Sequence, residues 1–316
     1  MIISIQSQVL HGHVGNSAAA FPIQHLGIPV TAVPTTLLSN HPHYPTMRGR
    51  VLEPDLLRDL LIGVEERGLV DGCLFLMTGY LGSAANGEVV ADFVTRAKRR
   101  NPALRYCCDP VMGDSDLGFF TDATLRDVFR DRLTPMADIS TPNAFEFAHL
   151  GDPPGNDRDA GSLIRSALCQ SYDKTIVITG MGLADPDAAR IDTVAAFGGR
   201  LWKVSTPRLP CRPAGTGDLL TALLVARLAQ NMTLPQALET AVSSVFAVLL
   251  NTASVNATEL ALIESRAELE SRKPRFRALE IQAGRETYRS GRSPRSLKTS
   301  QCSANSVGGI GGRIKN

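Results

Sequence analysis

The sequence predicts an α/β fold in which a mostly parallel central sheet is covered by helices on both faces. Short apolar runs that suit buried strands alternate along the chain with longer segments of helical periodicity. Such alternation is typical of parallel strands joined by helices. The 316 residues suffice for one large domain or two small ones, and a composition of 43% hydrophobic and 20% charged residues is that of ordinary globular proteins.

The expected elements can be assigned in order. Apolar runs predict strands, and three- and four-residue apolar spacing predicts helices, the first of which (SAAAFPIQHLG) is closed by a glycine. A hairpin is expected over residues 193–206, with Trp202 as a packing residue. The predicted strands are residues 2–5, 28–34, 73–78, 104–109, 139–141 and 176–179. The predicted helices are residues 17–27, 54–68, 88–100 and 219–230, with one more from residue 144.

Each predicted strand leads into polar or glycine-rich residues. Because ligands of parallel sheets bind at the carboxyl ends of the strands, six such loops on one edge predict a binding site there. The loops contain residues 6–7 with 11–20, 39–44, 79–88, 108–114, 141–146 and Gly180.

The four residues GTGD, at 215–218, precede the helix expected over 219–230. Glycine on both sides of Thr216 lets the backbone approach a ligand closely. A helix N-terminus offers unpaired N–H groups and a partial positive charge, so this loop predicts an anion site with Asp218 at its edge. The alternative is that Asp218 only caps the helix.

Two carboxylates at the same edge, Asp109 and Glu146, are hard oxygen ligands of the kind that suits Mg²⁺. Together with the anion site they predict a nucleotide phosphate bridged by Mg²⁺, with Asp218 as the base that takes a proton from an attacking hydroxyl. The alternative for Asp109 is a turn cap at Asp-Pro, and for Glu146 a solvated position in the first turn of a helix.

Charge and cysteine usage exclude several classes of protein. Residues 281–316 hold seven of the 33 basic residues and one of the 31 acidic ones, which leaves residues 1–280 mildly acidic and gives no reason to expect nucleic acid as a partner. The six cysteines form no CxxC pair and predict reduced thiols in a cytoplasmic protein. Arg227 interrupts the longest apolar helix expected, so no membrane segment is predicted.

No G-x-x-x-x-G-K-[ST] loop and no protein-kinase glycine loop is present, so phosphoryl transfer would need another architecture. The chain resembles the ribokinase-like kinases, and within them the pyridoxal kinase family, from about residue 1 to 265. The order and spacing of six stretches carry the resemblance: IQSQVLHGHVGNSAAAFP at 5–22, SNHPHY at 39–44, GYLGSA at 79–84, CDPVMGD at 108–114, TPNAFE at 141–146 and GTGD at 215–218.

The resemblance implies a ribokinase-like three-layer sandwich and an ATP-dependent pyridoxal kinase that uses Mg²⁺, with a monovalent cation such as K⁺ as an option, and forms a homodimer. Asp218 matches the catalytic base for the 5′-hydroxyl of pyridoxal. The residues matched to the anion hole are Gly215, Thr216 and Gly217; those matched to the vitamin pocket are Ser7, His41 and Tyr80; those matched to the nucleotide and metal side are Asp109, Asp114, Thr141, Asn143, Glu146 and Thr179.

The chain also departs from the family pattern. Leu38 precedes SNH, Pro42 follows it, and Met47 stands near a position where many relatives have tryptophan, which leaves the preference among vitamers open. Residues 118–120 (GFF) stand where some relatives carry a cysteine that reacts with the aldehyde product. A hydroxymethylpyrimidine kinase would share GTGD but would not need the SNH and GYLGSA loops together, and a carrier that binds the vitamer without turnover is a second alternative.

The chain is expected to contain one kinase domain over residues 1–282. The remaining segment, 283–316, is rich in Ser, Gly and Arg and has almost no apolar periodicity. Because such a segment buries too little surface to offset the entropy of ordering, we expect a disordered basic tail.

Overall fold

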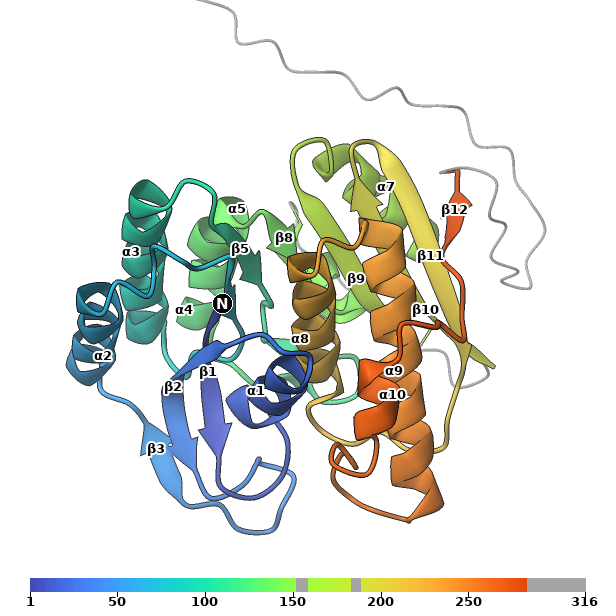
Figure 1. The fold of residues 1–316 in the computed structure, drawn as a ribbon, viewed down its shortest axis with the longest axis horizontal. Helices are drawn as coiled ribbons and strands as arrows, with labels where there is room; N and C mark the ends of the chain where they lie inside the picture. The colour runs from blue at the N-terminus through green and yellow to red at the C-terminus, as the bar shows by residue number, and fades with distance from the viewer. Residues whose placement is uncertain (152–158, 183–188, 283–316) are drawn as a thin grey trace, which may run out of the picture. The chain divides into compact units, whose positions relative to one another are not determined.

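The computed structural model describes residues 1–151, 159–182 and 189–282. Within this part of the chain, ten strands form one sheet in the order β12-β11-β10-β9-β8-β5-β4-β1-β2-β3 (Figure 1). The strands of this sheet are β1 (Ile2–Val9), β2 (Val30–Leu38), β3 (Gly49–Val51), β4 (Phe75–Thr78), β5 (Arg105–Cys108), β8 (Ile139–Ser140), β9 (Thr175–Met181), β10 (Arg190–Phe197), β11 (Arg200–Pro207) and β12 (Leu279–Ile281). The expected tail from residue 283 lies outside the described residues.

The six central strands β2, β1, β4, β5, β8 and β9 run parallel, as predicted. Antiparallel strands complete both edges: β3 pairs with β2, and β10 to β12 continue from β9. Strands β10 and β11 form the expected hairpin, whose turn residues Gly198 and Gly199 both have positive φ, as a tight hairpin turn requires. Trp202 is buried in the core next to α8 and α9, which confirms its packing role.

Helices cover both faces of the sheet (Figure 1). On one face lie α2, α3, α4, α6 and α7, and on the other α1, α8, α9 and α10. Their bounds are α1 (Asn16–His25), α2 (Pro54–Glu66), α3 (Ala84–Arg100), α4 (Ala123–Val128) with the π-helical turn η1 (Phe129–Leu133) and α5 (Thr134–Met136), α6 (Ala144–Leu150), α7 (Ala160–Gln170), α8 (Thr216–Ala229), α9 (Leu234–Ser254) and α10 (Arg266–Glu270). A small hairpin, β6 (Gly113–Asp114) with β7 (Gly118–Phe119), stands apart from the main sheet.

The core follows the alternation of strand side chains between the two faces. In β4, Leu76 packs toward α2 and α3, whereas Phe75 and Met77 pack toward α1 and α8. In β9, Ile176 and Ile178 pack against α6 and α7, whereas Val177 packs against α8 and α9. A sheet buried on both faces explains why the predicted strands were continuous apolar runs.

Several element boundaries differ from the prediction, and two of them have identifiable reasons. Helix α3 begins at Ala84 rather than at residue 88, because the Ser83 hydroxyl accepts a hydrogen bond from the Asn86 N–H and caps the helix. Strand β1 extends four residues beyond the predicted Ile5, because Gln8 and Val9 continue its parallel pairing with Leu37 and Leu38 of β2. Ser7 therefore lies within β1.

The longest apolar helix is α9, not the helix that contains Arg227, so the sequence-based identification of the longest apolar helix was wrong. By length and composition alone, α9 could cross a membrane. However, 61% of its most apolar window is buried, and it packs against α8 and the sheet as a core helix does.

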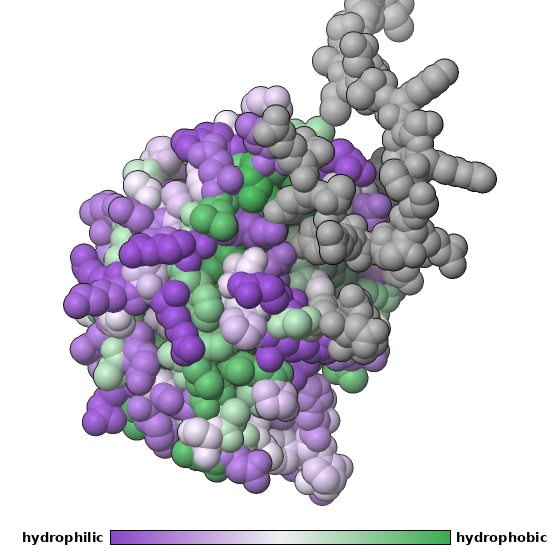
Figure 2. Space-filling model, turned by 90° about the vertical axis from the view of Figure 1, so that its right-hand side faces the viewer, coloured by the Kyte–Doolittle hydropathy of each residue, from purple (hydrophilic) through white to green (hydrophobic). Residues whose placement is uncertain are grey.

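On the face toward the right of Figure 1, hydrophilic side chains border a band of hydrophobic ones (Figure 2).

Candidate active site

The candidate site includes the glycine that precedes α8. Gly215 is the N-cap of α8 and has φ of +82°, a conformation that favours glycine. A Cβ at this position would overlap the carbonyl oxygen of His13, so the α8 start packs directly on the loop after β1. In contrast, a Cβ at Gly217 would meet nothing within 4 Å. No side chain of the described residues caps this end of α8, which leaves the N–H groups of its first turn for another partner, as in an anion site.

Asp218 lies in this first turn of α8 and is partly exposed. Its surroundings nevertheless disfavour the charged form, since burial raises the pKa of its carboxyl and a backbone hydrogen bond from Gly15 only partly offsets this effect. A carboxylate with a raised pKa, next to a helix N-terminus and open space, is suited to accept a proton. The geometry thus supports more than a helix-capping role.

Asp109 follows β5 and is 6% exposed. Its Oδ2 lies 3.1 Å from the hydroxyl of Thr221, and the same hydroxyl lies 2.9 Å from Oγ1 of Thr141, which follows β8. Burial raises the pKa of Asp109 well above its usual range, and the negative charges of Glu146 and Asp218 raise it further. Asp109 is therefore the point at which the carboxylates of the site repel one another.

Glu146 is buried rather than solvated, which excludes the alternative considered for it from the sequence. Its Oε1 accepts the N–H of Met112 at 2.9 Å, and its Oε2 accepts the N–H of Asn143 at 2.9 Å. Asn143 in turn caps α6 through the N–H of Glu146, so the two residues form a capping box. Glu146 thus holds the loop after β5 against the start of α6, while burial raises the pKa of its carboxyl.

These donors fit a Mg²⁺ ion that shares phosphate oxygens. Among residues 1–151, 159–182 and 189–282, no group of three His, Cys, Asp or Glu side chains could hold a metal by itself. Mg²⁺ typically needs only one or two carboxylates together with water and substrate phosphates. The repulsion between Asp109 and Glu146 is what a bound cation would relieve.

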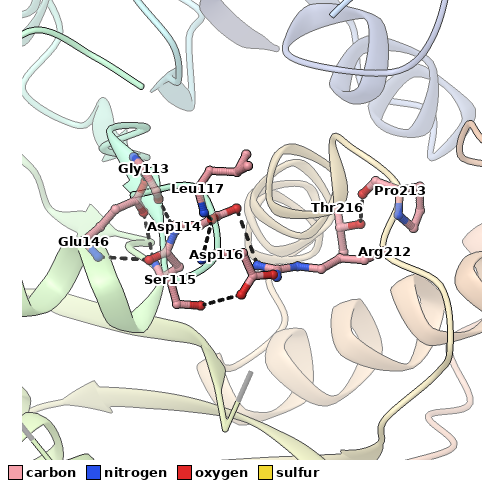
Figure 3. Close-up of polar contacts among 10 residues, drawn as sticks. Gly113, Asp114, Ser115, Asp116, Leu117, Glu146, Arg212, Pro213 and Thr216 are labelled. Carbon is pink, nitrogen blue, oxygen red and sulfur yellow. Dashed lines mark hydrogen bonds and ion pairs between the residues drawn. The ribbon is translucent and has the colours of Figure 1, made fainter. Parts of the chain in front are cut away.

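The loop before α8 reaches across to the β6–β7 hairpin (Figure 3). Arg212 forms ion pairs with Asp114, at 3.5 Å, and with Asp116. Asp114 Oδ1 also accepts the backbone N–H groups of Asp116 and Leu117, at 2.9 and 2.8 Å. Asp114, matched to the nucleotide side from the sequence, therefore shapes the hairpin and joins it to the anion-site loop.

The remaining predicted residues lie at the same edge of the sheet. Thr179, within β9, pairs with Asn143 through an isolated parallel bridge and donates its N–H to the Pro142 carbonyl at 3.0 Å. Ser7 is 6% exposed, and a Cβ on Gly15 would overlap its hydroxyl. Tyr80, after β4, is half-buried, and burial raises its pKa.

His41 is buried and is held from a distant part of the chain. Its Nε2 lies 2.8 Å from Oε1 of Glu259, which follows α9. Neither Glu259, Thr221 nor Arg212 was predicted from the sequence. Thr221 had a local signal, because it lies three residues after Asp218 on the same face of a helix. Glu259 is 218 positions from His41 and had none.

The fold and this site define a small-molecule kinase. A family model described as phosphomethylpyrimidine kinase matches residues 71–261. Pyridoxal kinase PdxY of Leifsonia xyli subsp. xyli is 38% identical over 266 residues, which cover 84% of this chain and 94% of the relative. The chain belongs to the pyridoxal kinase family.

Solved structures agree with this assignment. The pyridoxal kinase from Leishmania donovani in complex with ADP and pyridoxine is 26% identical, has a TM-score of 0.79, and covers 89% of this chain and 99% of its own. A putative phosphomethylpyrimidine kinase from Bacteroides thetaiotaomicron is also 26% identical with a TM-score of 0.79, and covers 89% of this chain and 97% of its own. The predicted ribokinase-like α/β fold is confirmed.

Proposed function

We propose that the protein is an ATP-dependent pyridoxal kinase, which transfers the γ-phosphate of ATP to the 5′-hydroxyl of pyridoxal. The observation that carries the proposal is the placement of Asp218 in the first turn of α8, beside open N–H groups and against the loop that follows Ser7. The family membership and the solved relative with ADP and pyridoxine support the choice of substrates.

In the proposed reaction, Asp218 accepts the proton of the 5′-hydroxyl as its oxygen attacks the γ-phosphorus, and the bond to the ADP oxygen breaks. The N–H groups at Thr216 and Gly217 stabilise the charge on the transferred phosphoryl, because they are fixed before the substrate arrives. The Thr216 hydroxyl donates to the Pro213 carbonyl at 2.9 Å and thereby holds this loop in shape. Positioning and electrostatics thus supply most of the acceleration.

We further propose that Asp109, with Glu146 behind it, holds Mg²⁺. When bound, the ion would neutralise phosphate charge. Thr221 would orient Asp109 toward it through the 3.1 Å hydrogen bond. Asp114, Thr141, Asn143 and Thr179 are proposed for the nucleotide side, and Ser7, His41 and Tyr80 for the vitamin side. Removing divalent cations with a chelator should abolish transfer, and adding Mg²⁺ should restore it.

We also propose that the protein is a homodimer and that it acts in the cytoplasm. Its mass in solution, measured by light scattering, tests whether it is a dimer. Cys73, Cys107, Cys108 and Cys211 are free thiols, which suits a reducing compartment.

The second candidate substrate is a hydroxymethylpyrimidine, which the description of the family model favours. Comparing kcat/KM for pyridoxal and for hydroxymethylpyrimidine, with direct detection of each phosphorylated product, separates the two. Preference for pyridoxal supports the proposal, and preference for the pyrimidine contradicts it. Tight pyridoxal binding without ATP consumption would instead indicate a carrier.

A further inference from the structure

Glu259 lies in the segment that follows α9, far in sequence from the site loops. Its side chain is only 14% exposed. Burial by itself would raise the pKa of this carboxyl, but hydrogen bonds from Tyr44, His41 and the His13 N–H together lower it. Glu259 is therefore an ionised, partly buried carboxylate at neutral pH, and all of these partners belong to the loops after β1 and β2.

Each oxygen of Glu259 serves one of those loops. Oε1 accepts from His41 Nε2 at 2.8 Å and from the Tyr44 hydroxyl at 2.7 Å, whereas Oε2 accepts from the backbone N–H of His13 at 3.0 Å. A Cβ on Gly12 would lie 2.6 Å from Oε2, and Gly12 has φ of +88°, so glycine lets the first loop approach the carboxylate. One side chain thus ties two loops together.

The first of these loops also contacts the catalytic machinery. The His13 carbonyl packs on Gly215 of the anion site, Gly15 packs on Ser7, and the Gly15 backbone interacts with Asp218. A shift of residues 12–15 would therefore disturb Ser7 on the vitamin side, together with Asp218 and the start of α8. The N–H of His13 is the point at which Glu259 holds this segment.

Glu259 also sets the hydrogen-bonding state of His41. Because a carboxylate only accepts, Nε2 of His41 carries the proton, and Nδ1 is then free to accept the backbone N–H of His43 at 3.3 Å. Both ring nitrogens are thereby occupied by the protein. These two hydrogen bonds fix the orientation of the His41 ring.

We propose that Glu259 is a positioning residue for the vitamin substrate: it fixes the loops at residues 12–15 and 41–44 in the arrangement that binds pyridoxal. The proposal rests on the proposed kinase function and names a residue outside all the motifs that carry the family resemblance. It predicts that Glu259 affects pyridoxal binding and leaves the nucleotide side unchanged, since the hydrogen bonds described for it reach neither Asp109, Asp114 nor Arg212.

The test is the Glu259→Gln variant of the full chain. Glutamine has the same shape, but its amide NH₂ must face either the His13 N–H or the His41 and Tyr44 donors, so in each orientation a donor meets a donor. Losing a hydrogen bond to a charged group in this way should raise the KM for pyridoxal about tenfold. The KM for ATP should stay within about twofold of the original value, because binding of the nucleotide is not touched.

Glu239→Gln is the matched control. Glu239 lies on α9, its side chain is also 14% exposed, and it is ion-paired to Arg277 at 3.1 Å, away from the site. Its substitution should leave both KM values unchanged. Tyr44→Phe removes one hydrogen bond from Glu259 and serves if Glu259→Gln fails to fold; it should raise the KM for pyridoxal about threefold.

The outcomes separate this inference from the proposed function. A selective rise in the KM for pyridoxal supports the positioning role. Turnover by both variants with an unchanged KM for pyridoxal, or an equal rise in the KM for ATP, overturns the positioning role and leaves the kinase assignment intact. If the unsubstituted protein transfers no phosphate to pyridoxal, the proposed function fails and the inference fails with it.

Discussion

Asp218 is held where its negative charge is disfavoured, because burial raises its pKa and the Gly15 backbone opposes this only in part. A general base must be ionised, so turnover should decline as the pH falls through this raised pKa. We expect the acid limb of the kcat profile to lie above about 3.9, the value of an unperturbed aspartate. An acid limb at or below that value would show that Asp218 is not the base whose ionisation limits turnover.

Thr221 connects Asp109 to Thr141 from inside α8 and is 1% exposed. Thr221→Val keeps the shape of the side chain but leaves the buried Asp109 without this donor. We expect kcat/KM for Mg-ATP to fall about tenfold. Thr240→Val is the control, since Thr240 is a buried helical threonine whose hydroxyl donates only to the Gln236 carbonyl, one turn earlier. If kcat/KM for Mg-ATP were the same for the two variants, Thr221 would have no role in the site.

At the scale of elements, the loop before α8 and the β6–β7 hairpin are joined through Arg212 (Figure 3). The pair is partly exposed, so its contribution is small, and Arg212→Gln should raise the KM for ATP by no more than about fivefold. Arg200→Gln removes a similarly exposed ion pair with Glu280, remote from the site, and should leave the KM for ATP unchanged. A larger effect on pyridoxal than on ATP would contradict the assignment of this side to the nucleotide.

The six parallel strands were predictable because they are buried on both faces and therefore appear as apolar runs, whereas helices α7 and α9 were not predicted. The helix at Ala144 began where it was expected, since its capping box is local in sequence. Helix α3 started early because the cap at Ser83 was overlooked, and the antiparallel strand β12 was missed because it has only three residues. Boundaries that depend on a single cap or a single pairing are the hardest to predict.

The loops of the site could be predicted because the carboxyl ends of parallel strands meet at one edge of the sheet. The structure brings Ser7, Asp109, Thr141 and Asp218 to that edge. Contacts between distant segments could not be predicted, since no pattern in the sequence links Glu259 to His41 or Arg212 to Asp114. Those contacts depend on how the folded loops meet.

At the scale of the whole molecule, residues 1–282 are proposed to form the complete kinase unit. The last described strand, β12, pairs with β11, and its Glu280 is ion-paired to Arg200. A chain that ends after residue 282 keeps these contacts, so it should keep the melting temperature and the kcat of the full chain. Loss of activity on this truncation, with folding retained, would give the segment from 283 a role in catalysis.

The full chain should be stabilised against unfolding by its substrates. A ligand that binds only the folded state at 100 times its Kd contributes about 2.7 kcal/mol. Saturating Mg-ATP should therefore raise the melting temperature by roughly 5–10 °C. Asp109→Asn should lose most of this shift if Asp109 holds the cation as proposed. A shift of the same size in the variant would place the cation elsewhere.

The most direct test of the account is phosphate transfer from Mg-ATP to pyridoxal by the native chain and by Asp218→Asn, measured side by side. The native chain should form pyridoxal 5′-phosphate, and the variant should bind pyridoxal but turn over roughly 10²- to 10⁴-fold more slowly, as expected for loss of a general base. Equal turnover by the two proteins would contradict the assignment of Asp218 as the base.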